Sequence, residues 1–183
     1  MKGLETGVPC EFSRGIIVRF GYHDAPMVTS DLFRQVMGNF ATGITVITTQ
    51  GGNGKPYGLT VNSFTSVSLD PLLVLVCLDN RLSGLQSFRD SKHFGVSMLS
   101  EHQEDVSRIF AKKDAERPES IFFEGKLGIP LLNNSLAVME CRTVEVYAGG
   151  DHQIFLGEVE HAEVLQTDHP LLYFRGKYQR ISY

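Results

Sequence analysis

Two long segments with the composition of β-strands, Leu136–Tyr147 and Ile154–Leu165, constrain the fold more than any other feature of the sequence. Gly149-Gly150-Asp151 lies between them, and glycine adopts the positive φ angles that tight turns require. The pattern predicts a long antiparallel hairpin. We therefore expect a chain that is mainly β.

Further strands are predicted where apolar and β-branched runs are bounded by turn signals, such as Gly51–Gly54 and Asp70-Pro71. Strands that follow one another directly disfavour a doubly wound parallel sheet. Closing about six antiparallel strands in meander order removes their edges, so we expect a small barrel. The shorter predicted strands are Ile44–Thr49, Tyr57–Leu69, Leu72–Leu78, Phe94–Leu99 and Leu172–Tyr178.

Three helices are predicted from apolar residues at helical spacing. The first begins with Ser30 as its N-cap and is ended by Gly43, and the third follows a capping box made by Ser100 and Gln103. The second is short. The apolar faces contain Leu32, Phe33, Val36, Met37 and Phe40 in the first helix, Leu82, Leu85 and Phe88 in the second, and Val106, Ile109 and Phe110 in the third.

The length of 183 residues fits one domain with its own core. Residues 1–28 have no apolar stretch typical of a secretory signal, and we expect them to form a loosely attached arm on a domain of residues 29–183. The net charge of −4 disfavours nucleic acid and anionic membranes as partners. Three cysteines without a Cys-x-x-Cys pair indicate a reducing compartment, so a cytoplasmic location is expected.

The common catalytic signatures are missing from the sequence. The six histidines do not pair with each other or with cysteine at zinc-ligand spacing, so no metal site is expected. Gly54-Lys55 is followed by Pro56, where a P-loop requires serine or threonine. There is neither a G-x-G-x-x-G nor a G-x-S-x-G motif, which disfavours a Rossmann dehydrogenase and an α/β-hydrolase.

Two segments carry unusual polar groups. Gly58–Ser66 combines hydroxyl and amide side chains in an extended run, which indicates either an edge strand with one wet face or the wall of a pocket for a flat, heteroatom-rich ligand. His152 directly follows the Gly149-Gly150-Asp151 turn, a position that suits a functional histidine and equally a solvated one.

Four collinear segments within residues 31–181 resemble the short-chain flavin reductases: Phe33–Thr49, Gly58–Ser68 with the following Asp70-Pro71, the G-D-H-x-x-x-x-G-E-V stretch Gly150–Val159, and Pro170–Tyr178. The resemblance implies a six-stranded antiparallel split β-barrel of the FMN-binding type, generally a homodimer. It also implies reduction of free FMN or FAD by NADH or NADPH, with reduced flavin supplied to the separate oxygenase of a two-component monooxygenase.

Two alternatives remain open at this point. One is a split barrel that retains FMN and reduces a corrinoid, a quinone or ferric iron. The other is a non-catalytic split barrel that binds flavin or haem. The resemblance departs from the family at Ser97, where the family often has asparagine.

The resemblance also assigns roles to residues. It places His152 near the nicotinamide and Ser83 on the flavin phosphate, whereas Tyr173, Phe174, Arg175, Gly176 and Tyr178 help to hold the pyridine nucleotide. The remaining residues that the resemblance places against the flavin are Gly58, Leu59, Thr60, Val61, Asn62, Ser63, Phe64, Cys77, Leu78, Asp79, Leu99, Ser100 and Gln103.

Overall fold

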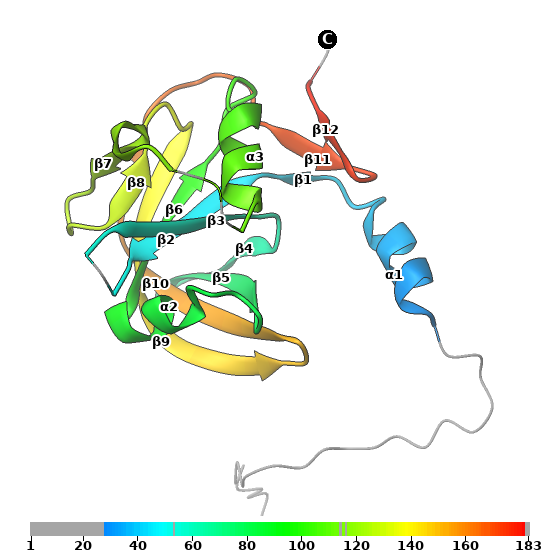
Figure 1. Cartoon of the computed structure of the whole chain (residues 1–183), viewed down its shortest axis with the longest axis horizontal. Helices are drawn as coiled ribbons and strands as arrows, with labels where there is room; N and C mark the ends of the chain where they lie inside the picture. The colour runs from blue at the N-terminus through cyan, green and yellow to red at the C-terminus, as the bar shows by residue number, and fades with distance from the viewer. Residues whose placement is uncertain (1–27, 53, 114, 116, 182–183) are drawn as a thin grey trace, which may run out of the picture.

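The computed structural model describes residues 28–52, 54–113, 115 and 117–181. The predicted N-terminal arm, residues 1–28, therefore lies outside the described residues except for Val28. The described chain forms a strand-rich body from which helix α1 (Ser30–Met37) projects on one side (Figure 1).

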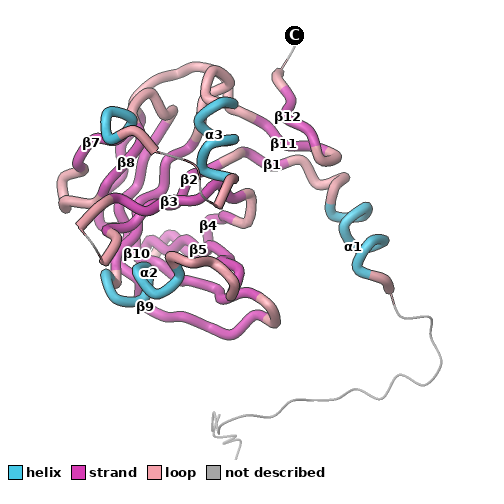
Figure 2. The backbone as a smooth tube through the Cα atoms, viewed as in Figure 1, coloured by secondary structure: helices cyan, strands magenta, loops and turns pink. Residues whose placement is uncertain are grey.

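A sheet of seven strands forms the body, and all neighbouring strands are antiparallel. Its two end strands, β3 and β4, are consecutive in the chain and separated only by residues 62–63. Because two residues span so little distance, the sheet must curve until its ends come close, which produces a barrel split between β3 and β4 (Figure 2). The strands in sheet order are β3 (Pro56–Val61), β2 (Thr45–Gln50), β6 (His93–Met98), β9 (Ala137–Gly149), β10 (His152–Val164), β5 (Leu72–Asp79) and β4 (Phe64–Leu69).

This architecture confirms the prediction of a mainly β antiparallel barrel, with three differences. The barrel sheet has seven strands and not the predicted six. The predicted strand Tyr57–Leu69 is divided after Val61, because the residues before this point pair with β2 and those from Phe64 onward pair with β5. Within the seven-stranded sheet, the strands are connected as three hairpins, β2–β3, β4–β5 and β9–β10, and not as a simple meander.

The predicted long hairpin is confirmed as β9–β10, and its turn contains Gly150 at φ +72°. Gly157 of β10 lies against the Phe94 ring, where an added Cβ would be only 2.4 Å from a ring carbon. Glycine is therefore required at this position for Phe94 to pack into the barrel interior. That interior includes Ile47, Val76, Phe94 and Phe155, all buried.

The helices are shorter than the predicted ones. Thr29 caps α1 in place of Ser30, and α1 ends at Met37, well before Gly43. Helix α2 (Leu85–Ser91) covers the barrel interior through Phe88, and α3 (Glu104–Ala111) buries Phe110 in a second core cluster with Ile44, Val46, Leu99, Leu132 and Leu171. None of the described helices is long and apolar enough to cross a membrane.

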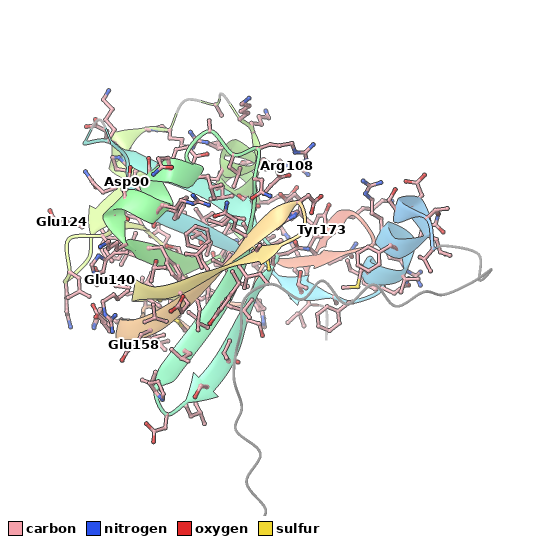
Figure 3. All side chains as sticks on the ribbon, turned by 90° about the horizontal axis from the view of Figure 1, so that it is seen from below. Asp90, Arg108, Glu124, Glu140, Glu158 and Tyr173 are labelled. Carbon is pink, nitrogen blue, oxygen red and sulfur yellow. The ribbon has the colours of Figure 1, made fainter. Side chains whose placement is uncertain are left out.

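The last predicted strand, Leu172–Tyr178, is instead a tight hairpin of β11 (Leu172–Phe174) and β12 (Lys177–Gln179). Arg175 and Gly176 adopt φ angles of +48° and +77°, and these angles reverse the direction of the chain between β11 and β12. Strand β1 (Thr42–Gly43) adds to β11, and the resulting small sheet lies between the barrel and α1 (Figure 3).

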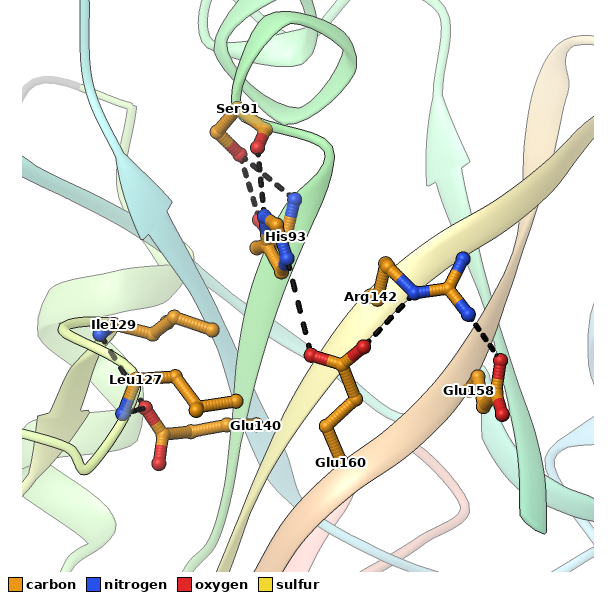
Figure 4. Close-up of polar contacts among 8 residues, drawn as sticks. All are labelled: Ser91, His93, Leu127, Ile129, Glu140, Arg142, Glu158 and Glu160. Atoms are coloured by element: carbon orange, nitrogen blue, oxygen red, sulfur yellow. Dashed lines mark hydrogen bonds and ion pairs between the residues drawn. The ribbon is translucent and has the colours of Figure 1, made fainter.

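Glu140 fixes a second small sheet. Its side chain is fully buried, and Oε1 accepts hydrogen bonds from the backbone N–H groups of Leu127 (2.9 Å) and Ile129 (3.4 Å) in the turn between β7 (Phe122–Glu124) and β8 (Pro130–Leu132) (Figure 4). A short 3-10 turn, Glu119–Ile121, precedes β7. Figure 4 also shows Arg142 bonded to Glu158 and Glu160, an ion-pair network that links β9 to β10.

Candidate functional site

A cavity of about 540 Å³ lies where β3, the end of β5 and the end of α3 meet. Four cationic side chains and one carboxylate line it, so its charge suits an anionic ligand such as a phosphate. We call it the cationic cavity. Its lining residues are Tyr57, Leu59, Thr60, Asp79, Arg81, Leu82, Ser83, Phe110, Ala111, Lys112, Lys113 and Arg117.

Asp79, the last residue of β5, holds Arg81 at this cavity. The Arg81 guanidinium donates to the carboxylate from Nη2 (2.6 Å) and from Nε (3.0 Å), and the Arg81 backbone N–H donates to it as well (2.8 Å). These hydrogen bonds hold the pKa of Asp79 well below its usual range, with a smaller contribution from the charge of His152. The pair therefore stays ionised at physiological pH and fixes the direction of the guanidinium.

His152 lies beside this pair, because it is aligned with Asp79 across the β5–β10 ladder. Its Nδ1 is 2.7 Å from Asp151 Oδ1, and this hydrogen bond lowers the pKa of the Asp151 carboxyl. The turn is attached to the loop after β5 through Asn80, whose backbone N–H donates to Asp151 O at 3.0 Å. His152 does not line the cationic cavity itself. Its side chain is 40% exposed and lies next to Asp79, which does line the cavity.

Three hydroxyl groups of the polar segment Gly58–Ser66 donate to backbone carbonyls, although Thr65 Oγ1 reaches only the carbonyl of the next residue, Ser66 (3.3 Å). Thr60 Oγ1 donates to the carbonyl of Ser107 in α3 (2.7 Å), and Ser63 Oγ donates to the carbonyl of Cys77 (2.8 Å). These bonds lie at the split, where β3 and β4 have no ladder between them. The polar composition therefore partly serves the fold, and backbone groups and Asn62 are left for a ligand.

A second, apolar cavity of about 200 Å³ is lined by three other predicted flavin residues, Asn62, Phe64 and Leu99. The remaining residues around it come mainly from β1, the start of β2 and the end of β6: Thr42, Gly43, Ile44, Thr45, Met98, Leu136 and Pro170. The structure therefore divides the predicted flavin residues between a charged and an apolar cavity.

Three of the five predicted pyridine-nucleotide residues, Tyr173, Gly176 and Tyr178, line a third cavity of about 430 Å³, together with Glu104, Arg108 and Lys177. Figure 3 shows Arg108 and Tyr173 on the side of the barrel that carries the β11–β12 hairpin. Arg175 is engaged elsewhere, since its Nη2 donates to Asn39 Oδ1 (2.7 Å) and its guanidinium lies over the Phe174 ring (5.0 Å).

The other predicted residues have structural neighbours and do not line these three cavities of the described structure. Leu78 is buried in the barrel core, and Val61 packs against that core. Gly58 allows the Phe110 ring to approach, since an added Cβ would lie 2.9 Å from it. Ser100 and Gln103 are both buried, and Gln103 Oε1 accepts the Ser100 N–H (3.0 Å). The predicted capping box is nevertheless wrong, because α3 begins only at Glu104 and its N-cap, Gln103, makes no side-chain cap hydrogen bond. Ser97 is also buried, where its Oγ accepts the Leu132 N–H (3.0 Å).

The cationic residues Arg81, Lys112, Lys113 and Arg117 were not predicted. The Lys112-Lys113 pair directly after a predicted helix and the Asp79-x-Arg81 spacing after a strand are the sequence signals that point to them. Within the described residues, no group of three or more histidine, cysteine or acidic side chains is arranged to hold a metal ion.

Residues 37–182 match the family described as "Flavin reductase like domain". The chain is 40% identical over 146 residues to the reductase component of the flavin-dependent trigonelline monooxygenase of Acinetobacter baylyi, covering 79% of this chain and 47% of that protein. It is 36% identical over 146 residues to the reductase component of the Rhodococcus opacus 4-nitrophenol 4-monooxygenase/4-nitrocatechol 2-monooxygenase, covering 80% and 78%. The chain thus spans about half the length of the first relative and most of the second.

Among solved structures, an NADH:FAD oxidoreductase of Streptomyces globisporus, in complex with NAD and FAD fragments, matches with a TM-score of 0.79 at 37% identity, covering 86% of this chain and 98% of that one. The family match and the structural match both cover most of this chain. The chain belongs to the flavin reductase-like domain family, which confirms both the family resemblance and the split-barrel fold.

Proposed function

We propose that this chain is an NAD(P)H:flavin oxidoreductase that reduces free FMN or FAD and supplies the reduced flavin to a separate monooxygenase. The observation that carries the proposal is a cavity lined by four cationic side chains, which suits the anionic phosphate of a flavin, in a chain of this family. The names of the relatives support it, because two are reductase components of monooxygenases and one is an NADH:FAD oxidoreductase.

The flavin phosphate binds in the cationic cavity. Arg81, held in place by Asp79, provides a fixed cation, and Ser83 adds an exposed hydroxyl donor on the same loop. Leu59 and Thr60 of β3 form the adjoining wall, and Asn62, Phe64 and Leu99 extend it through the apolar cavity. Charged and apolar walls joined by one strand segment match a flavin, which combines an anionic phosphate with a flat ring system.

Bound flavin and nicotinamide supply the hydride chemistry themselves. The task of the chain is to bring the two rings together and to place hydrogen-bond donors where negative charge develops on the reduced flavin. Because Nδ1 of His152 is bonded to Asp151, Nε2 is the nitrogen that remains for a ligand. We assign His152 to positioning of the nicotinamide carboxamide, and Tyr173, Gly176 and Tyr178 to holding the rest of the pyridine nucleotide.

Homodimer formation is part of the proposal. In the described structure α1 buries none of its eight residues, and even its apolar residues Phe33 and Val36 are each 59% exposed. Leu69, at the tip of the β4–β5 hairpin, is 89% exposed. Apolar faces of this kind require a cover, and a second copy of the chain provides one. Light scattering should give twice the 20.4 kDa mass of the chain, and a 20 kDa particle at micromolar concentration would contradict the dimer.

The cysteines support the proposed cytoplasmic location, since Cys77 and Cys141 of the described part are both free thiols. Burial raises the pKa of the Cys141 thiol to about 12, with smaller contributions from Glu160 and Glu140. A thiol with such a pKa is unreactive at neutral pH. Cys141 should therefore not make the activity sensitive to mild thiol oxidants.

The proposed activity is tested by mixing purified protein with NADH and following absorbance at 340 nm while FMN or FAD is added. We expect nearly colourless protein and a rate that saturates with added flavin and exceeds the flavin-only blank. Tightly bound yellow flavin with no stimulation by added flavin would favour a flavin-retaining reductase of another acceptor. No decay with either NADH or NADPH would remove the enzymatic function.

A further inference from the structure

The cationic cavity is larger and carries more cations than a single phosphate needs. Arg81 lies on the loop after β5, whereas Lys112, Lys113 and Arg117 lie at the end of α3 and on the loop after it. These two groups come from different elements of the fold and both border one space of about 540 Å³. Two separate cationic groups in one cavity suit a ligand with two phosphates.

The two cationic groups differ in how they are neutralised. The Arg81 guanidinium is paired with Asp79, which holds it in place at the position proposed for the first phosphate. The Arg117 guanidinium is bonded only to a backbone carbonyl, that of Lys112 (3.3 Å), among the described residues. Among the described residues, Arg117 therefore has no carboxylate partner at the end of α3, and this position is separate from the one that Arg81 and Ser83 offer to a first phosphate.

Arg117 is held by aromatic rings. Its guanidinium carbon lies 5.6 Å from the centre of the Tyr57 ring and 5.4 Å from that of Phe110, both within the range of a cation–π contact. Its Nε is buried and has no hydrogen-bond partner within the described part of the chain. A buried donor without a partner costs free energy, and a phosphate oxygen would satisfy it.

Aromatic and guanidinium surfaces in the same cavity also suit a nucleobase. Tyr57 and Phe110 line the cavity next to Arg117, and a purine stacks on aromatic rings and on guanidinium planes. We infer that the cationic cavity binds an adenosine 5′-diphosphate group, with Arg117 as the residue that recognises it. This inference rests on the proposed function, because the two substrates that carry such a group are FAD and NADH.

The test is calorimetric titration of the purified protein with ADP, compared between the wild type and Arg117→Ala. We expect ADP to bind the wild type and the substitution to raise its Kd at least tenfold, while Arg117→Lys, which retains the charge but loses the planar fork, lies between them. Lys126→Ala is the matched control, since Lys126 is exposed on the β7–β8 turn and does not line the cavity; it should leave the ADP Kd within twofold.

Steady-state kinetics identifies which substrate provides the group. A rise in the ratio of KM for FAD to KM for FMN in Arg117→Ala would assign the site to the flavin, and a rise in KM for NADH with FMN as acceptor would assign it to the pyridine nucleotide. ADP binding that is undetectable in the wild type, or equal in Arg117→Ala and wild type, would overturn the inference. Failure of the proposed function would differ, as no flavin would then stimulate NADH oxidation by the wild type.

Discussion

The cationic cavity and the apolar cavity share one segment of chain and differ in what they offer a ligand. Residues 57, 59 and 60 line the first, which also contains four cationic side chains, whereas residues 62 and 64 line the second, whose lining is mainly apolar and has no charged side chain. Binding in the first should depend on charge, salt and pH. The second is bordered by the core residues Ile44 and Leu99, so changes at these residues should act mainly on stability.

Leu99→Ala tests the apolar side and has the largest expected effect. Leu99 is 1% exposed in the core cluster beneath α3, and truncation of a buried leucine removes about 2–5 kcal/mol of unfolding free energy. Urea denaturation measures the loss. Lys113→Ala, on the cationic side, should change stability by less than about 0.5 kcal/mol. Equal losses in the two variants would remove the distinction between the cavities.

His152→Ala should mainly affect use of the pyridine nucleotide. The loss of one positioning hydrogen bond lowers kcat/KM for NADH about tenfold to a hundredfold, whereas the flavin Kd should stay within about threefold. His102→Ala is the control, because His102 is exposed, lies 4.0 Å from the Glu101 carboxylate and lines none of the three cavities described above. A collapse of flavin binding with normal NADH use would place His152 in the flavin pocket, and no change in either would make it a solvated residue.

FMN affinity should rise with pH between about 5 and 7.5. The lowered pKa of Asp79 keeps the Asp79–Arg81 pair ionised across this range, and its contribution is lost only in strong acid as the carboxylate is protonated. The phosphate loses its second proton near pH 6, so the dianion that the cations favour forms above it. We expect the Kd to fall about twofold to fivefold in a fluorescence titration. Riboflavin, which has no phosphate, is the control, and an identical pH dependence for riboflavin would contradict a phosphate site.

Cys77→Ala should have the smallest effect. Cys77 is half-buried on β5, and burial raises the pKa of its thiol. We expect a loss of about 1 kcal/mol in unfolding free energy and little change in turnover. A large rise in flavin Kd in this variant would instead place the side chain on the ring.

The fold was predictable from the sequence where periodicity and turn residues agree. The β9–β10 hairpin and strand β5 were placed within a few residues. Two long strand-like segments around Gly150 specify the hairpin locally, and one continuous apolar run specifies β5. The division of Tyr57–Leu69 was not predictable, since which neighbour each half pairs with is decided by the closure of the whole barrel. The hairpin at Arg175-Gly176 was missed because it follows a strand of only three residues.

The site was predictable only in part, and for a similar reason. The resemblance pointed to Asp79 and Ser83, which do border the cationic cavity, but hydroxyl composition alone could not show that Thr60 and Ser63 are bonded to carbonyl groups of the protein. Arg81 and Arg117 were missed because they are 36 positions apart in the sequence and meet only when the loops after β5 and α3 come together.

The most direct test of the account compares FMN with riboflavin, because the two differ only in the phosphate that the cationic cavity is proposed to bind. Fluorescence titration at low salt should give a Kd for FMN at least about tenfold below that for riboflavin, and the difference should shrink in Arg81→Ala and at high salt. Equal affinities of the wild type for FMN and riboflavin would contradict the account.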